Sequence, residues 1–534
     1  MKYNITQYDK DLLLQSEIQY KYKLLVLSNN KQVIDELTSL QTIGSYSIDS
    51  GSSIRRTTSF TMYLDNSYKD YSVEQKLYEW IGYNFKLQIG IFSIRDDNYK
   101  WFDCGYYLIT EGNTSYNASE NSITTSLSDW YSKLDGTRNG QIGGAPTISI
   151  PNIDDSGNPV TIKQTTEMIL KGETDITEYI VDDIGEFYGI PQNNPDYIQY
   201  RKDNPLWNQL PYDLEYEAGC NVGDILSEIN DLYPNCQMYF DTYGNFCFNM
   251  IPSCEYDPLM LDDSYIQSIL VSDNTESVSY DIKSIKNVTE IFGSSYEIDR
   301  YSDVCTTSTN IYTLSIDSYN SYYAGDMIAF IPNTTNIQNM KIRINALDPI
   351  PIYYEYTTNY ISDTLLEANK TYVIQIKKVN GEYVAYYLGQ FQPHALCVLT
   401  NDANDSKYTK AYFAEKYNCN KENIVLRVEQ NSPFSVQKLG ELLDVKNGNE
   451  YDNILSDSVA LENAIYINRR SSSMNDTVTI SVAMIPFLDV NTKVEYRKQQ
   501  EIESHEYIID SITNDTESMT SNIVMHRFYP LYYA

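Results

Sequence analysis

Three runs of alternating residues between positions 44 and 94 constrain the fold more than any other part of the sequence. A Ser/Gly break at residues 50–53 separates the first run from the second. The side chains that share a face are Tyr46 and Ile48 in the first run, Thr58, Phe60, Met62 and Leu64 in the second, and Phe85, Leu87, Ile89 and Ile91 in the third. A strict period of two indicates half-buried antiparallel strands. Three such strands separated by turns predict a small β-barrel or sandwich, with no obvious room for a catalytic site.

Composition extends this prediction to the whole chain. The chain has 534 residues, enough for about three to five domains of roughly 100–150 residues each. It contains 51 tyrosines, and tyrosine favours half-buried strands and protein interfaces. We therefore expect a mainly β protein with some α+β parts.

The net charge of −34 restricts the partners that the chain can bind. Binding to nucleic acid phosphates or to an anionic membrane needs clustered lysine and arginine, so both are disfavoured. An acidic surface that repels DNA suits a conduit through which DNA slides, while solubility alone explains the charge equally well. No apolar run approaches about 18–20 residues, so we expect no membrane insertion. The polar N-terminus and the absence of a Cys-x-x-Cys pair indicate synthesis in the cytoplasm with reduced thiols.

Shifts in pattern along the chain predict four regions. Residues 1–144 form a β domain that ends in a glycine-rich stretch, and residues 145–261 form an α+β domain. Residues 262–304 and 396–534 form a second β domain with helices, which residues 305–395 interrupt as an inserted β-module. In the α+β domain, an apolar stripe predicts a helix at 222–232 with Asn221 as its N-cap. Helical spacing also predicts one helix near 162–169 and another through Ile176, Ile180 and Ile184.

Motifs for catalysis, cofactors or metals do not emerge from the sequence. The three histidines, His394, His505 and His526, stand outside any ligand pattern. The spacing of Cys236, Cys247 and Cys254 matches no zinc site. The adjacent acidic pairs at 154–155, 182–183 and 262–263 are typical of turns and helix caps, and a calcium site in the loop 152–158 would lack the usual ligand spacing. We therefore assign no catalytic, cofactor-binding or metal-binding residue and expect no enzyme.

Arg55 and Arg56 form the one basic pair in the first β domain that suggests a role. They are candidates for ion pairs with an acidic neighbouring subunit. Alternatively, they are an outward-facing residue and its neighbour at the edge of a sheet.

Several motifs, taken in order, resemble one known family. They are the segment 44–64 with SIRRTTSFTMYL, the segment 80–91, WFDCGYYLIT (101–110), LSDWYSKLDG (127–136), the long stretch 210–252, SPFSVQKLGELL (432–443), the segment 450–470, TVTISVAMIPFLDVNTKVEY (477–496) and HEYIIDSI (505–512). In this order they resemble the bacteriophage tail hub family, that is, baseplate hubs and the N-terminal hub region of tail-tip, or tail-associated, proteins. Each motif is weak alone, and their order over most of the chain carries the resemblance.

The resemblance implies a fold and an assembly. Each chain would hold two tail-tube-like β-barrel domains, a mixed α+β domain and, here, an inserted β-sandwich-like module. Three chains would form a homotrimer that caps the tail tube and lines the DNA channel. Expected partners are a tail tube or distal tail ring protein, the tape measure protein, and tail-tip spike, fibre or lysin proteins, with genomic DNA passing through without specific binding. The family is structural, so the resemblance implies no catalytic residue and a place in the virion, at the tail tip or baseplate.

The inserted module offers an alternative function. Its strand order resembles small β-modules of phage tail fibres and baseplates, which implies contact with a neighbouring tail protein or with a host glycan. The candidate surface residues are Tyr353, Tyr354, Tyr356, Tyr386 and Tyr387, although packed strand aromatics explain the same pattern. The alternative is therefore a receptor-binding adhesin of the tail tip, and a cell-wall hydrolase is the least supported of the three functions.

Overall fold

The chain folds mainly into β-structure, with 41% of the described residues in strands and 17% in helices, which confirms the predicted class. This description rests on a computed structural model. It describes residues 3–37, 40–64, 80–110, 114–145, 147–152, 154, 159–182, 209–210, 213–233, 236–250, 258–272, 275–354, 358–379 and 381–527. The loop 152–158, considered above as a calcium site, lies largely outside these residues.

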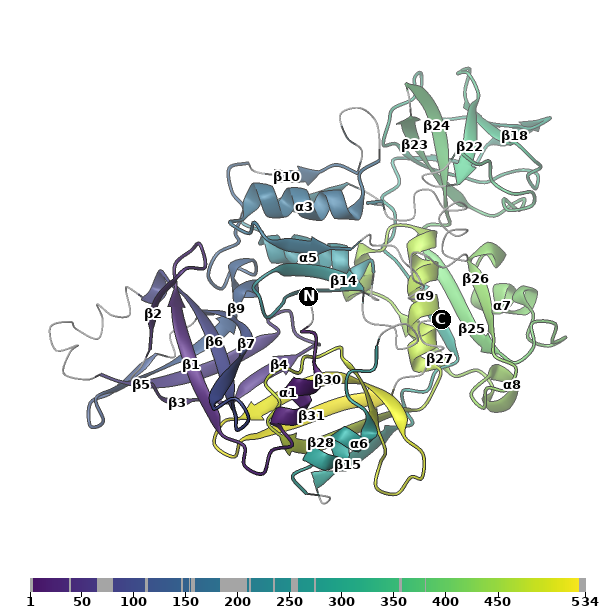
Figure 1. The fold of residues 1–534 in the computed structure, drawn as a ribbon. Coiled ribbons are helices and arrows are strands. Elements are labelled where there is room, and N and C mark those ends of the chain that lie inside the picture. The colour runs from purple at the N-terminus through teal and green to yellow at the C-terminus, as the bar shows by residue number, and fades with distance from the viewer. Residues whose placement is uncertain are drawn as a thin grey trace.

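The largest element is a nearly closed sheet of fourteen strands (Figure 1). Its N-terminal strands are β1 (Tyr20–Leu27), β2 (Val33–Glu36), β3 (Leu40–Ile43), β4 (Tyr46–Asp49), β5 (Arg56–Tyr63), β6 (Asn84–Ser93), β7 (Asn98–Ile109), β8 (Ser115–Asn117) and β9 (Ser122–Asp129). Its other strands are β15 (Ser277–Asp281), β28 (Asn475–Ala483), β29 (Lys493–Tyr496), β30 (His505–Asp515) and β31 (Thr520–Arg527). Antiparallel pairing of β4 with β30, with Ile48 opposite Ile512, joins the two sets. The sheet therefore runs through both segments that were predicted as barrels.

The predicted alternation is confirmed in the core of this sheet. Along β5, Thr58, Phe60 and Met62 are buried, and the residues between them are exposed or half-buried. The inward side chains of β6 pack in the same hydrophobic cluster as residues from β28 and β30. Helices α1 (Gln7–Leu12) and α6 (Asp263–Ile269) add side chains to that cluster. Asp262 caps α6 by accepting the backbone N–H of Tyr265, which confirms the capping role predicted for one acidic pair.

An α+β region lies against the sheet (Figure 1). Its elements are β10 (Thr147–Ile150), α3 (Ile162–Glu173), β11 (Tyr179–Val181), β12 (Leu214–Glu217), α5 (Val222–Asp231), β13 (Cys236–Phe240) and β14 (Phe246–Met250). Asn221 begins α5 as predicted, and its backbone N–H donates to Asp224 at 3.2 Å. The helix predicted through Ile176, Ile180 and Ile184 is wrong where the structure describes it. Ile180 lies in β11, which pairs in parallel with β14, so pairing across the sheet overrides the local spacing.

A second, smaller sheet of four strands has helices on both faces. Its order is β26 (Ile424–Val428), β25 (His394–Thr400), β16 (Val288–Phe292) and β27 (Leu443–Lys446). Helix α9 (Asp457–Ser471) packs on one face of β25 and β16, and α7 (Lys410–Tyr417) and α8 (Val436–Leu439) cover the other face. Short 3-10 turns are η2 (Trp130–Lys133), η5 (Lys421–Asn423) and η6 (Asn449–Asn453).

The module at the upper right of Figure 1 has its own core and an eight-stranded sheet. Its strands are β17 (Arg300–Ser302), β18 (Cys305–Ser308), β19 (Ile311–Leu314), β20 (Met327–Phe330), β21 (Lys341–Ile344), β22 (Ile350–Tyr354), β23 (Tyr372–Val379) and β24 (Glu382–Gly389). The two edge strands, β17 and β18, follow one another in the chain, so the sheet curls back on itself. The four predicted domain boundaries stay a prediction. In the part of the chain described above, no helix is both long enough and apolar enough to cross a membrane.

Replacing Phe60 by alanine tests the core of the shared sheet. Phe60 is 1% exposed and packs against Trp80 and Phe85, with ring centroids 5.8 and 6.1 Å apart. We expect Phe60→Ala to cost about 3–5 kcal/mol of unfolding free energy, because it leaves a cavity. Tyr63→Ala, on the same strand but 43% exposed, should change it by less than about 0.5 kcal/mol. Chemical denaturation of both variants measures this, and equal losses would contradict the assigned core.

Candidate functional site

Arg56 lies where three parts of the chain meet. Its guanidinium donates to the backbone carbonyl of Phe240 in β13 and to the carboxylate of Asp489, 2.6 Å away. Its backbone N–H donates to Asp129 at the end of β9, at 3.0 Å. The side chain is 1% exposed. One buried arginine on β5 therefore joins the N-terminal strands, the α+β hairpin and the segment between β28 and β29.

Arg55 repeats this connection one residue earlier. Its guanidinium donates to Gln237 at 2.6 Å and stacks on the ring of Tyr239, 3.6 Å from the ring centroid. Gln237 also accepts from the side chain of Asn491 and donates to the carbonyl of Ser50. Arg55 is 3% exposed, so this pair of arginines lies inside the subunit.

Burial and neighbouring charges act differently on the ionisable groups of this cluster. Burial lowers the pKa of Arg55, although Tyr239 and Asp489 oppose it. Burial also disfavours the cation of Arg56, but the nearby Asp489 carboxylate helps to raise its pKa above the ordinary value. Burial raises the pKa of Asp129 to about 6, although the hydrogen bond from the N–H of Tyr131 and the charge of Arg56 both lower it. The cluster therefore keeps Arg56 charged and disfavours the charge on Asp129.

The sequence identified both arginines as candidate functional residues but indicated none of the residues that they contact. Gln237 and Asp489 lie 182 and 433 residues from Arg55 and Arg56, respectively. Nothing in a single sequence signals pairings over such separations. The inter-subunit role of Arg55 and Arg56 stays a prediction, and the contacts described here all lie within one chain.

The tyrosines predicted for the module surface occupy different environments. Tyr386 and Tyr387 are each 7% exposed, and Tyr387 belongs to the core of the module. Tyr353 and Tyr354 on β22 are half-buried, and the ring of Tyr353 packs edge-on against Tyr360. Tyr356 lies outside the described residues. The structure thus leaves Tyr353 and Tyr354 as the candidates with exposed surface.

Each histidine lies next to a carboxylate of the same chain. His394 is buried, with its Nε2 2.9 Å from Glu290, and it stacks on Phe292. His505 lies 3.4 Å from Glu501, and His526 lies 2.7 Å from Asp510. Among the described residues, no three histidine, cysteine or carboxylate side chains are grouped as metal ligands would be. The seven cysteines in the described ranges are free, and Cys247 is buried in β14.

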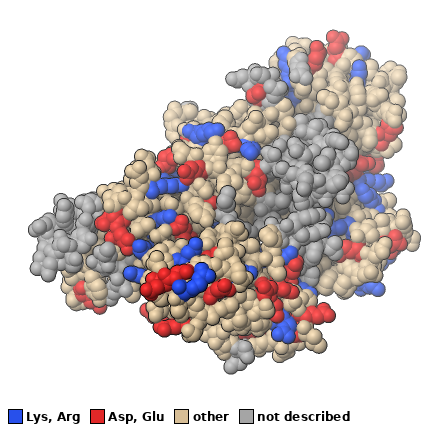
Figure 2. Space-filling model, in the orientation of Figure 1, with Lys and Arg blue, Asp and Glu red and all other residues tan. Residues whose placement is uncertain are grey.

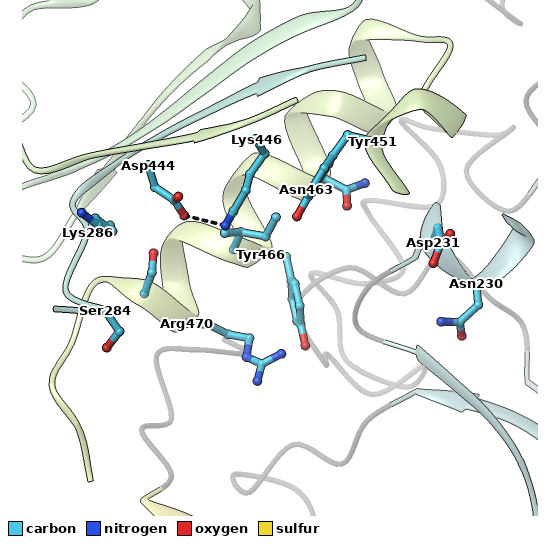
Figure 3. A pocket seen from close by; sticks show the side chains of 12 residues that line it. Asn230, Asp231, Ser284, Lys286, Asp444, Lys446, Tyr451, Asn463, Tyr466 and Arg470 are labelled. Carbon is cyan, nitrogen blue, oxygen red and sulfur yellow. Dashed lines mark ion pairs between the residues drawn. The ribbon is translucent and has the colours of Figure 1, made fainter. Parts of the chain in front are cut away.

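A cavity of about 570 Å³, lined mainly by residues with polar or charged side chains, lies beside the four-stranded sheet (Figure 3). Strand β27, the second half of α9, the end of α5 and the segment before β16 line it. Lys286, Asp444 and Lys446 lie at one end of the view, and Asn230 and Asp231 lie at the other. Asp444 and Lys446 form an ion pair at 3.2 Å. The sequence did not indicate this cavity, because its walls come from distant segments.

Comparisons with known proteins give a partial match in sequence and a remote one in structure. A family model described as a domain of unknown function (DUF5048) matches residues 431–532. No curated protein matches the sequence. Solved structures described as tail proteins are similar over nearly the whole chain. The prophage MuSo2 43 kDa tail protein from Shewanella oneidensis has a TM-score of 0.41 and 11% identity, with 96% of this chain and 100% of that chain covered. The tail protein from Neisseria meningitidis MC58 has a TM-score of 0.44 and 7% identity, with 96% of this chain and 98% of that chain covered. Prophage tail protein gp18 from Listeria monocytogenes EGD-e has a TM-score of 0.41 and 10% identity, with 95% of each chain covered. TM-scores below 0.5 at such identities do not assign this chain to a family.

Removing the charge of Arg56 tests the connection between the three parts. Arg56→Met leaves the Asp489 carboxylate and the Phe240 carbonyl without their donor, so we expect a loss of about 3–5 kcal/mol of stability. Arg95→Met removes an exposed ion pair with Asp96, in which the side chains are 75% and 43% exposed, and should change stability far less, because water screens exposed ion pairs. Thermal unfolding of both variants checks this. A similar small shift in both would mean that Arg56 does not hold the parts together.

The raised pKa of Asp129 predicts a pH dependence of stability. The pKa of Asp129 in the folded chain, about 6, exceeds the ordinary value of 3.8. The contribution of protonated Asp129 to folding stability is therefore complete below pH 3.8 and is lost as the pH rises through about 6. Relative to Asp129→Asn, the wild-type chain should lose up to about 3 kcal/mol between pH 4 and pH 7. Thermal midpoints of both proteins across this range measure the difference. A gain in stability of the wild-type chain relative to the variant over this range would contradict the prediction.

Proposed function

We propose that the chain is a structural protein of a bacteriophage tail, a homotrimeric hub at the tail tip or baseplate. It caps the tail tube and connects it to the tip. The observation that carries the proposal is the single sheet of fourteen strands. Strands from residues 20–129 and from residues 277–527 share it, which is the arrangement that suits two tube-like halves side by side in each chain.

Pairing of β4 with β30 makes these two halves one rigid unit. Four residue pairs connect the strands, from Asp49 with Ser511 to Tyr46 with Asn514. Asn514 is 1% exposed, and its side-chain amide donates to the carbonyl of Tyr46. A unit of this kind supplies two similar positions in a ring, so three chains supply six. This supports a ring that matches a sixfold tube.

The charge distribution supports a channel that does not retain DNA. The chain carries a net charge of −34. On the face drawn in Figure 2, acidic and basic side chains are interspersed, and the described residues form no continuous basic stripe there. Phosphate binding needs such a stripe, so DNA passes through a ring of these chains by repulsion and without specific contacts.

The proposed hub works within a larger assembly. The partners are two further copies of the chain, a tail tube or distal tail ring protein, the tape measure protein, and spike, fibre or lysin proteins of the tip. The place of action is the virion, after synthesis in the host cytoplasm. The chemistry of the described part of the chain calls for no cofactor, metal ion or catalytic residue.

The module of residues 305–395 is proposed as an outward insertion. The chain enters and leaves it through two adjacent segments, since the N–H of Tyr296 donates to the carbonyl of Phe391 and that of Gly293 to the carbonyl of Pro393, both at 2.9 Å. The hydroxyl of Tyr296 also donates to the carbonyls of Leu388 and Leu455. Because both connections lie together, the module attaches at one point. Contact with another tail protein fits this place, and the burial of Tyr386 and Tyr387 reduces the surface left for a glycan.

Native mass spectrometry and cryo-EM test the hub. The purified chain should form a species of three times 61.6 kDa, and density on the tail axis should match this fold. Replacing residues 297–390 by a short Gly/Ser linker should leave the trimer and tail assembly intact, because the flanking segments already lie together. A stable monomer that is absent from virions would refute the hub. Assembled tails that lose host binding after the replacement would favour the adhesin.

A further inference from the structure

Strand β27 forms an open edge of the four-stranded sheet. Among the described residues it pairs only with β16, in parallel. The backbone N–H of Val288 donates to the carbonyl of Leu442, which fixes the phase of this pairing. Along a strand of a parallel sheet, the backbone N–H and C=O groups of successive residues point alternately to the neighbouring strand on one side and to the opposite side. Residues 442, 444 and 446 therefore bond toward β16, and the N–H and C=O groups of Leu443 and Val445 point to the open edge.

One face of this edge is apolar. Leu443 and Val445 are 37% and 48% exposed. Their neighbours on β16 are Val288 and Glu290, and Val288 packs in the cluster under α7 and α8. Leu443 thus continues this apolar face to the edge, and Val445 lies beside Glu290, whose carboxylate is 2.9 Å from His394. Leu439, at the end of α8 and 47% exposed, adds to the apolar surface near this edge.

The other face of the edge opens on the cavity of Figure 3. Asp444 and Lys446 alternate with the apolar residues and line that cavity. Lys286 lies at the same end of it, and Arg470 projects from α9 on the same side of the view. Lys286, Lys446 and Arg470 thus give the cavity lining three cations, and Lys446 is paired with Asp444 at 3.2 Å. In a chain of net charge −34, this end of the cavity favours an incoming carboxylate, whereas Asp231 lies at the far end.

We propose that β27 binds an extended segment of another protein, which adds to the sheet as a fifth strand and alternates apolar and acidic side chains. Its backbone bonds to Leu443 and Val445, its apolar side chains cover the same two residues, and its carboxylates enter the cavity near Lys286, Lys446 and Arg470. Addition of a strand to an open edge takes its affinity from backbone hydrogen bonds and its specificity from alternate side chains. This inference goes beyond the proposed hub and does not depend on the chain forming a trimer.

The combination of features favours a peptide over a small anion. A free phosphate or carboxylate would use the cations alone and would leave the apolar residues and the outward backbone groups as they are. An extended strand has a period of two, which is the period of the edge itself. One occupant then accounts for the backbone, apolar and basic features together.

Binding of synthetic peptides to the purified full-length chain tests the proposal. The probe is a fluorescein-labelled peptide of alternating valine and glutamate, and two controls replace its glutamates by lysine or methylate alternate backbone nitrogens. Fluorescence anisotropy should show saturable binding of the glutamate peptide, at least about tenfold tighter than of either control. Residue-resolved hydrogen exchange should show that this peptide protects the amides of Leu443 and Val445, which exchange rapidly in the free chain, while those of Asp444 and Lys446 stay protected throughout.

Three variants and a matched control locate the site. Val445→Pro removes one outward N–H and leaves the bonds to β16, and Lys446→Glu and Arg470→Glu reverse two of the charges. Each should weaken binding by about tenfold or more. Lys438→Glu, an equal charge change at an exposed residue of α8 outside the cavity, should leave the affinity unchanged, and circular dichroism confirms that each variant is folded.

The proposal is overturned if the glutamate and lysine peptides bind equally, if neither shows saturable binding, or if Lys438→Glu weakens binding as much as Lys446→Glu. It is also overturned if the peptide protects amides elsewhere and not those of Leu443 and Val445. These results are independent of the oligomeric state, so failure here leaves the proposed hub untouched, and a monomeric chain that binds the peptide refutes the hub alone.

Discussion

The buried guanidinium of Arg56 is the contact on which the arrangement of the three main parts depends. A charged group in a protein interior is tolerated only when counter-charges and hydrogen bonds surround it. Phe240 supplies a carbonyl from the α+β region, and Asp489 supplies a carboxylate from the C-terminal segment. If either part moves away, the charge loses a partner and remains buried. Docking of the α+β region and closure of the shared sheet are therefore coupled through one side chain.

The same cluster shows why two arginines in sequence need not mark a surface. Arg55 precedes β5, and its side chain turns to Tyr239 and Gln237 in the neighbouring hairpin. Gly105 has a φ of +122°, and a Cβ there would meet the Cδ of Arg56 at 3.0 Å. The fold thus makes room for the longer arginine by omitting a side chain from β7. The contacts of both arginines described above therefore stabilise the single chain.

Local periodicity predicted the parts of the fold whose pattern depends on one buried face. The strands that contain Phe60 and Leu87 and the helix begun by Asn221 are found where the pattern placed them. The pattern failed at Ile180, because parallel pairing with β14 decides that segment. It also did not separate surface from core at Tyr387, since the last six residues of β24 are buried on both faces. The pairing of Ile48 with Ile512 and the ion pair of Arg56 with Asp489 are long-range contacts that no local period encodes.

Two groups of cations in this acidic chain have different uses. Arg56 and Lys498 are buried against carboxylates, the latter 2.7 Å from Asp476, with both side chains less than 5% exposed. Such pairs fix which segments meet, and they are not available to attract a partner. Where cations gather in a cavity beside an open strand edge, as at Lys286 and Lys446, they act against a background of net charge −34. Screening confines their attraction to about 8–10 Å. Association with other proteins therefore depends on this local match of edge, apolar side chains and charge, because the overall electrostatic field repels acidic partners.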